Sequence, residues 1–275
     1  MGEIVLLKKD DIEQYKVIYF DNDEPVTYHL NEYDIKISPI LVKDAPTYNF
    51  AKQILLLDKN STNDIEIIQM NYLDFLLTRK LKEDQCLYMF YYIMDKCLNE
   101  PYFMPYDING QPFKKNGRNV LALCDEHGNA KGYITHKQFE DISKIILFQN
   151  DINYDDRTLS TDVQKVVEDY YRIKNKDIHI PSLGEQKTYV MSRTGFSMKD
   201  INEMTLRTFE GVYDNCLNSE IYLGEKIIQG SYKYDVKEDV LHPLYRKKKD
   251  PIEEAFASYE SVENKIGAQS LSSTT

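Results

Sequence analysis

The chain lacks tryptophan and is poor in glycine, proline and cysteine, with 11, 9 and 4 of these among 275 residues. Such low glycine and proline contents exclude a collagen and a low-complexity linker protein. No apolar run reaches the about 18 residues of a membrane-spanning helix. Acidic residues follow the short apolar run at the N-terminus, so we expect no secretory signal there.

Basic residues are outnumbered by acidic ones. Lys and Arg total 34 against 45 Asp and Glu, which makes the formal net charge −11. This balance argues against broad binding to a nucleic-acid backbone. The apolar fraction of 42% excludes wholesale disorder, and the length suits one large domain or two small ones.

Signatures of chemistry are missing as well. Neither a glycine-rich phosphate loop nor a G-x-S-x-G or H-E-x-x-H motif occurs. There is no C-x-x-C pair, and the polar run from Cys124 to His127 is typical of a hairpin tip and not of a zinc site. Cys86 and Cys97 are expected on one helix face about 16 Å apart, too far for a disulfide. We therefore predict a non-enzymatic protein with no catalytic residue, no metal and no cofactor.

The first 44 residues predict an N-terminal β element. YKVIYF (15–20) and VTYHL (26–30) flank the turn cluster DNDEP, a pattern that indicates an antiparallel hairpin. DIKISPILV (34–42) alternates at first, and Pro39 favours a strand end or an edge strand.

Residues 45–150 predict a helical domain. Pro46 suits a first helical turn, and the spacing of apolar residues over 65–80 predicts one amphipathic helix. Residues 82–100 are apolar nearly all round, so we expect a buried helix. A small hairpin insert is predicted at about 118–135, and Thr135 with Gln138 predicts the capped start of another helix.

Residues 160–235 predict a C-terminal helical region. Ser182 with Glu185 and Ser197 with Asp200 repeat the capping pattern, and a long helix is expected from about 198 to 230. Residues 236–275 are predicted to be an extended segment and a disordered tail. The fold class expected is α+β, predominantly α-helical.

The stretch around Gly195 has the outline of a helix-turn-helix, with two capped helices flanking a short turn. Arg193, Lys199 and Arg207 could neutralise phosphate, but several acidic residues on the second helix would repel it. A packed helical corner is therefore favoured, and a DNA-binding regulator remains the alternative from another functional class.

Two features indicate contacts with other proteins. The chain has 22 tyrosines, a residue type enriched at interfaces because it combines contact area with a polar tip. The basic run RKKKD could dock an acidic partner. The predicted partner-binding residues lie on the helices and in this run: Tyr88, Tyr91, Tyr92, Arg193, Phe196, Met198, Phe209, Tyr213, Arg246, Lys247 and Lys248.

Three stretches, taken in order and spacing, resemble a known family: LLLDKNSTNDIEIIQMNYLDFLL, GYITHKQFEDISKIILFQNDINYDD and VMSRTGFSMKDINEMTLRTFEGVYDNCLNSEIYLGEKIIQGSY. They are similar to tail-module proteins of tailed bacteriophages and prophages, in layout like baseplate-hub assembly proteins and tail assembly chaperones. The resemblance covers residues 50–235 and carries over no functional residue.

This resemblance implies a chaperone-like factor for phage tail or baseplate assembly. Its partners would be other tail or baseplate proteins, and it would act in the bacterial host cytoplasm. The composition predicts no membrane span and argues against nucleic acid as a partner. The alternative is a permanent structural subunit of the tail or baseplate, which would remain in the virion.

Overall fold

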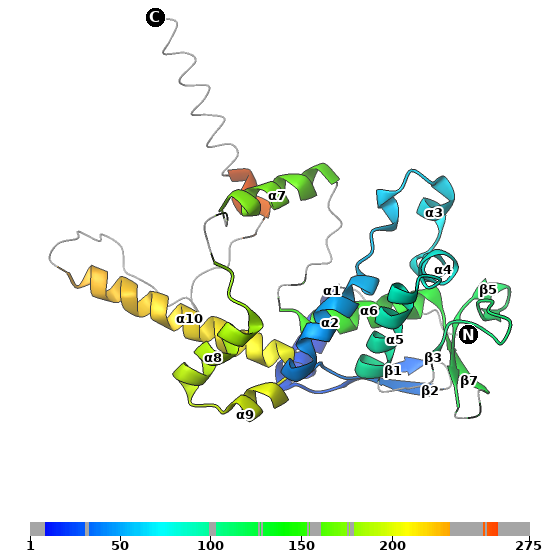
Figure 1. Cartoon of the computed structure of the whole chain (residues 1–275), viewed down its shortest axis with the longest axis horizontal. Helices are drawn as coiled ribbons and strands as arrows, with labels where there is room; N and C mark the ends of the chain where they lie inside the picture. Colours follow the sequence, from blue (N-terminus) through cyan, green and yellow to red (C-terminus); the bar gives the residue numbers. More distant parts are fainter. Residues whose placement is uncertain are drawn as a thin grey trace, which may run out of the picture. The chain divides into compact units, whose positions relative to one another are not determined.

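The computed structural model describes residues 9–30, 33–98, 103–125, 127, 129–152, 154, 161–174, 176, 179–231, 250 and 252–257. The described chain is mainly helical with a few short antiparallel strands, which confirms the predicted α+β class (Figure 1). It forms two compact units. Unit 1 comprises Met1–Tyr154 and Gly195–Val212, and unit 2 comprises Asp155–Thr194 and Tyr213–Thr275.

This grouping differs from the predicted segments. Residues 1–44 belong to the same unit as residues 45–150, and Gly195–Val212 joins that unit although it lies within the predicted C-terminal region.

The first described elements are helix α1 (Lys9–Ile18) and the 3-10 turn η1 (Phe20–Asn22), so the predicted strand over 15–20 is wrong. Ile12 is buried and Tyr15 and Tyr19 are half-buried, at helical spacing. Val17 and Ile18, which suggested a strand, point to solvent. The hairpin pairs β1 (Val26–Leu30) with β2 (Tyr33–Ile37) instead, and β2 ends before Pro39.

Short helices follow the first hairpin in unit 1, namely η2 (Val42–Asp44), α2 (Ala45–Ala51), η3 (Lys52–Leu55), η4 (Lys59–Ser61), α3 (Ile65–Gln69), α4 (Tyr72–Phe75), the π-helical turn η5 (Leu76–Lys80) and the longer α5 (Asp84–Leu98). Pro46 lies in the first turn of α2, as predicted. The single helix predicted over 65–80 is wrong, because Met70 is extended and the Asn71 side chain caps a new helix by accepting from the Asp74 amide at 2.9 Å.

The small hairpin insert is confirmed. Strands β6 (Leu121–Cys124) and β7 (Ala130–Ile134) pair antiparallel, and β3 (Phe103–Met104) adds to the other edge of β6. A second, two-residue ladder joins β4 (Lys114–Lys115) to β5 (Arg118–Asn119). The Asp125 side chain holds the tip of this hairpin, because its Oδ1 accepts from the His127 and Asn129 amides.

Helix α6 (His136–Asn150) is the central element of unit 1 and contacts α1, α4, β1 and β2. Thr135 and Gln138 form the predicted capping box, and Ile142, Ile145 and Ile146 are buried as expected. Polar side chains of α6 are buried too. Tyr28 Oη donates to Asp141 Oδ2 at 3.0 Å, and Asn150 Oδ1 accepts from the Ile40 amide at 2.6 Å. These bonds join α6 to the first hairpin and to the chain that follows it.

Helix α9 (Met198–Glu203) and the first turns of α10 (Leu206–Gln229) complete unit 1. The single helix predicted from 198 to 230 is therefore wrong. It breaks at Thr205, which pairs with Leu41 in an isolated antiparallel bridge. Backbone bonds from Val42 to Met204 (2.9 Å) and from Leu206 to Ile40 (2.7 Å) hold the break against a segment about 165 positions earlier in the chain.

Unit 2 contains α7 (Thr161–Lys174), α8 (Leu183–Thr194), the rest of α10 and a helical turn at 252–257. Lys174 Nζ contacts Glu254 Oε1 at 3.0 Å, which joins α7 to that turn. The predicted pair of Ser182 and Glu185 caps α8. Most of the predicted extended segment and tail, residues 236–249 and 258–275, lies outside the described residues.

Candidate protein-binding surfaces

Helix α5 carries tyrosines on its outer face and the core of unit 1 on its inner face. Phe90, Ile93 and Cys97 are buried, whereas Tyr88 and Tyr91 expose 56% and 39% of their surface. The prediction of a buried helix is therefore wrong for the tyrosine face, although the segment is apolar nearly all round. Two tyrosines three positions apart on a helix lie side by side, so together they present one aromatic patch.

Tyr92 lies at the margin of this patch and is half-buried. Its ring is 6.5 Å from that of Tyr88, and its hydroxyl donates to the Asp44 carbonyl at 3.3 Å. Burial, with a smaller effect of the Asp44 charge, raises the pKa of Tyr92 to about 12. Tyr92 therefore anchors α5 to the start of α2, and Tyr88 and Tyr91 are the members of the group that a partner could reach.

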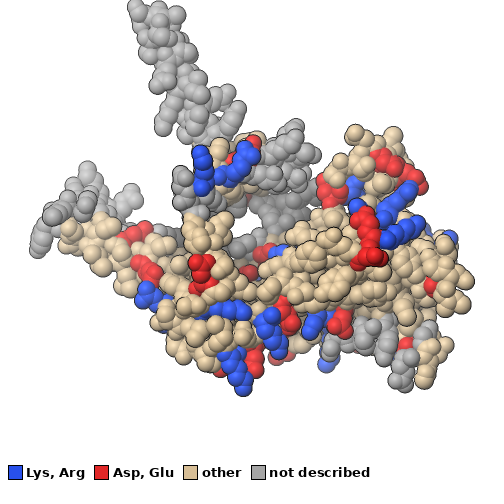
Figure 2. Space-filling model, in the orientation of Figure 1, with Lys and Arg blue, Asp and Glu red and all other residues tan. Residues whose placement is uncertain are grey.

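The distal half of α10 presents a second apolar surface, in unit 2. Four aliphatic side chains expose between 48% and 73% of their surface: Ile221, Leu223, Ile227 and Ile228. In Figure 2 the visible face of α10 is mostly uncharged, with scattered acidic and basic side chains. Large aliphatic side chains gathered on one helix are typical of a surface that is covered in an assembly.

Helix α8 contacts the preceding part of α10 within unit 2. The rings of Tyr189 and Tyr213 meet edge to face at 5.8 Å, and Arg193 forms an ion pair with Glu220. The Arg193 guanidinium also lies 5.7 Å from the Tyr189 ring centroid. Arg193 and Tyr213 therefore have an intramolecular role, as the residues that join α8 to α10.

The other predicted partner-binding residues divide three ways. Phe196 and Met198 are exposed beside the start of α9. Phe209 is 1% exposed and belongs to the core of unit 1, so its prediction as a contact residue is wrong. Its apolar side chain packs in the core and is not available to a partner. Arg246, Lys247 and Lys248 lie outside the described residues.

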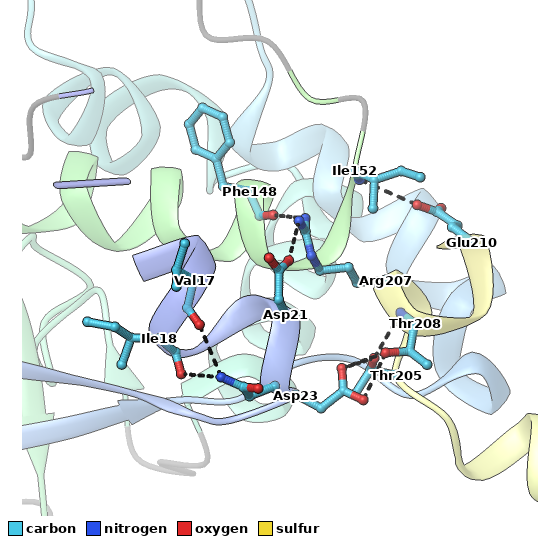
Figure 3. Close-up of polar contacts among 11 residues, drawn as sticks. Val17, Ile18, Asp21, Asp23, Phe148, Ile152, Thr205, Arg207, Thr208 and Glu210 are labelled. Carbon is cyan, nitrogen blue, oxygen red and sulfur yellow. Dashed lines mark hydrogen bonds and ion pairs between the residues drawn. The ribbon is translucent and has the colours of Figure 1, made fainter. Parts of the chain in front are cut away.

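A polar cluster that the sequence did not reveal holds the first turns of α10 within unit 1 (Figure 3). The Arg207 guanidinium donates to Asp21 Oδ1 at 3.0 Å and to the Phe148 carbonyl at 3.2 Å. Thr205 and Thr208 donate to Asp23 at 2.5 and 2.9 Å. No local pattern could predict this cluster, because its partners are more than 50 residues apart in the sequence.

This cluster bears on the helix-turn-helix interpretation. Arg193 and Arg207, expected to contact phosphate, both pair with carboxylates, while Lys199 is exposed. The two helices of the outline belong to different units, and the second, α9, is six residues long. The contacts of Arg207 within unit 1 therefore explain this residue better than a DNA contact does.

The described residues contain no group of three or more His, Cys, Asp or Glu side chains placed to hold a metal ion. The four cysteines are free thiols, and burial raises the pKa of Cys97 well above its ordinary value. No helix in the described part of the chain is long and apolar enough to cross a membrane. No family model, curated protein or solved structure matches the chain.

Proposed function

We propose that the chain is a non-enzymatic assembly factor of a bacteriophage tail or baseplate, which binds another tail protein through exposed apolar helix surfaces. The observation that carries the proposal is the distal half of α10, where four aliphatic side chains are open to solvent. The phage setting comes from the resemblance of residues 50–235 to tail-module proteins.

The arrangement on α10 suits a helix-in-groove contact. Ile221 and Ile228 are seven positions apart and lie on one side of the helix, whereas Leu223 and Ile227 lie about a third of a turn further round it. Between them Gly224 has open space where a side chain would project, so a partner can approach the α10 backbone there. The result is a broad apolar strip and not a single protruding residue.

The size of this strip bounds its affinity. Burying the exposed part of four aliphatic side chains contributes about 6 kcal/mol at most. A micromolar complex needs about 8 kcal/mol after the entropic cost of association. The α10 strip is therefore insufficient by itself for a micromolar complex, and the α5 tyrosines of unit 1 are a separate candidate surface.

The test is binding to tail and baseplate proteins encoded by the neighbouring genes, followed by calorimetry. We expect the double substitution Ile221→Ser and Ile227→Ser to weaken binding by at least about tenfold, while the fold stays intact by circular dichroism. Ile65→Ser with Ile68→Ser is the matched control, because these residues are also exposed on a helix, α3, where no side chain is buried.

Two results would contradict the proposal. One is failure of the wild-type chain to bind any tail or baseplate protein at micromolar concentration. The other is equal weakening by the α10 and α3 variants. Mass spectrometry of purified particles separates the two roles, because an assembly factor is absent from them and a permanent subunit is present in stoichiometric copies.

A further inference from the structure

The β4–β5 hairpin of unit 1 is a short, basic projection. Asn116 and Gly117 join its strands with φ angles of 53° and 76°. Positive φ at both central residues is the geometry of a tight type I′ turn, for which Asn-Gly is the preferred sequence. Figure 1 shows β5 at the outer margin of unit 1, near β7.

Three cations are carried by this hairpin, and all three are exposed: Lys114, Lys115 and Arg118. None of them forms an ion pair with a carboxylate of the described residues. Lys115 Nζ lies 5.0 Å from the centroid of the Tyr133 ring on β7, a cation–π contact that positions its charge.

Three described carboxylates on either side of the hairpin in the sequence are engaged by other groups. Asp74 accepts from the side chains of Asn71 and Asn119, at 2.5 and 2.7 Å. Asp107 and Asp125 accept amides of their own turns, and those backbone bonds are the largest influence that lowers the pKa of each carboxyl group. The hairpin cations are therefore left for an external anion.

The pairing of the hairpin places two of these charges in opposition. Lys115 lies directly across from Arg118, and Lys114 lies across from Asn119. Like charges directly opposite each other destabilise an antiparallel pair. A carboxylate at position 118 would turn the repulsion into attraction, and acidic residues are abundant elsewhere in this chain. The repulsion is relieved when an anion binds between the two side chains.

We propose that the β4–β5 hairpin is a docking site for an acidic segment of another protein. An acidic polypeptide fits better than a nucleic acid, because the remainder of this acidic chain repels a long polyanion. A short run of Asp and Glu can instead reach Lys115 and Arg118, which share one face of the ladder, while Lys114 lies on the opposite face. The site lies in unit 1 and does not depend on the α10 strip of unit 2.

The experiment uses the full chain and a fluorescein-labelled hexaglutamate peptide, with binding measured by fluorescence anisotropy at low salt. We expect Arg118→Glu to weaken binding about five- to tenfold, since it replaces an attraction with a repulsion. Arg118→Lys keeps the charge and should retain binding within about twofold. Lys36→Glu, on the exposed face of β2, is the matched control and should change binding by less than about twofold.

Stability separates a docking role from a structural one. Because Arg118→Glu pairs an acid with Lys115, its melting temperature should equal or exceed that of the wild type. The proposal is overturned if the wild type does not bind hexaglutamate, or if Arg118→Glu and Lys36→Glu weaken binding equally. Tighter binding of a single-stranded oligonucleotide of the same charge would also overturn it and would assign the hairpin to nucleic acid.

Discussion

Replacing Arg207 with alanine tests how strongly the first turns of α10 are held within unit 1. The Arg207 side chain is 12% exposed, and its guanidinium bonds to Asp21 and to the Phe148 carbonyl. It also lies 5.8 Å from the centroid of the Phe20 ring. The substitution removes all three contacts and leaves the backbone of α10 unchanged, because alanine is a good helix former.

The expected loss of stability is estimated from the two groups that Arg207 bonds, the Asp21 carboxylate and the Phe148 carbonyl. Asp21 is half-exposed, with 50% of its side chain open, so its ion pair with Arg207 contributes about 0.5 kcal/mol. The bond from a charged donor to the Phe148 carbonyl contributes about 1.5 kcal/mol, because that carbonyl loses its side-chain donor. We therefore expect Arg207→Ala to destabilise the docked segment by about 2 kcal/mol.

Hydrogen–deuterium exchange measures this loss where it occurs. A change of about 2 kcal/mol corresponds to roughly 30-fold faster exchange of the amides in residues 205–212, provided that closing is fast. Arg193→Ala is the control, because both side chains of the Arg193–Glu220 ion pair are exposed. We expect this substitution to change local exchange by only about twofold. If Arg207→Ala accelerates exchange by less than about threefold, the cluster in Figure 3 does not hold α10 in place.

Two further predictions concern protonation and thiol access. Bonds from the Ser182 amide and hydroxyl, with a smaller effect of His179, lower the pKa of Glu185 to about 2. The folded pKa lies below the ordinary 4.5, so the cap of α8 should be intact above about pH 4.5 and be lost as the pH falls through 2. An NMR titration of Glu185 with a midpoint near 4.5 would contradict this, and Ser182→Ala should raise the midpoint. Maleimide should label half-exposed Cys216 well before Cys97, which is fully buried with a raised pKa. Mass spectrometry of tryptic peptides checks the order, and equal labelling rates in the native protein would refute it.

Local signals predicted much of the helical architecture. The starts of α6, α8 and α9 were predicted from a Ser or Thr followed three positions later by Gln, Glu or Asp, and each forms the expected reciprocal hydrogen bonds. Gly195, in the short turn of the helix-turn-helix outline, adopts a φ of 78°. The small hairpin insert was also predicted, from its turn residues.

Prediction failed where two local patterns competed. The β-branched run before Phe20 suggested a strand, yet Ile12, Tyr15 and Tyr19 had helical spacing, and that spacing decided the outcome. The break at Asn71 has a local sequence signal, since Asn71 and Asp74 form a helix-capping pattern inside the apolar run. The break at Thr205 had no comparable signal, because its bridge to Leu41 depends on a remote segment.

For the candidate surfaces the sequence indicated which residue types favour protein contacts, but it did not predict which of these residues are exposed. Tyr88 and Phe209 are both aromatic residues on amphipathic helices, yet Tyr88 faces solvent and Phe209 lies in the core. The aliphatic residues of distal α10 were predicted as part of a long helix and not as an open strip. Which face of a helix is covered depends on the elements packed against it, and these come from distant parts of the chain.

The sequence by itself determined where turns and most helix starts lie, because capping bonds form between residues two to four positions apart. Only the tertiary structure decided that Gly195–Val212 belongs to unit 1 and that Arg207 forms an ion pair with Asp21. It also decided which apolar residues stay open to a partner. The physical reason is that burial and ion pairing depend on groups brought together from positions more than 100 residues apart, which no local pattern encodes.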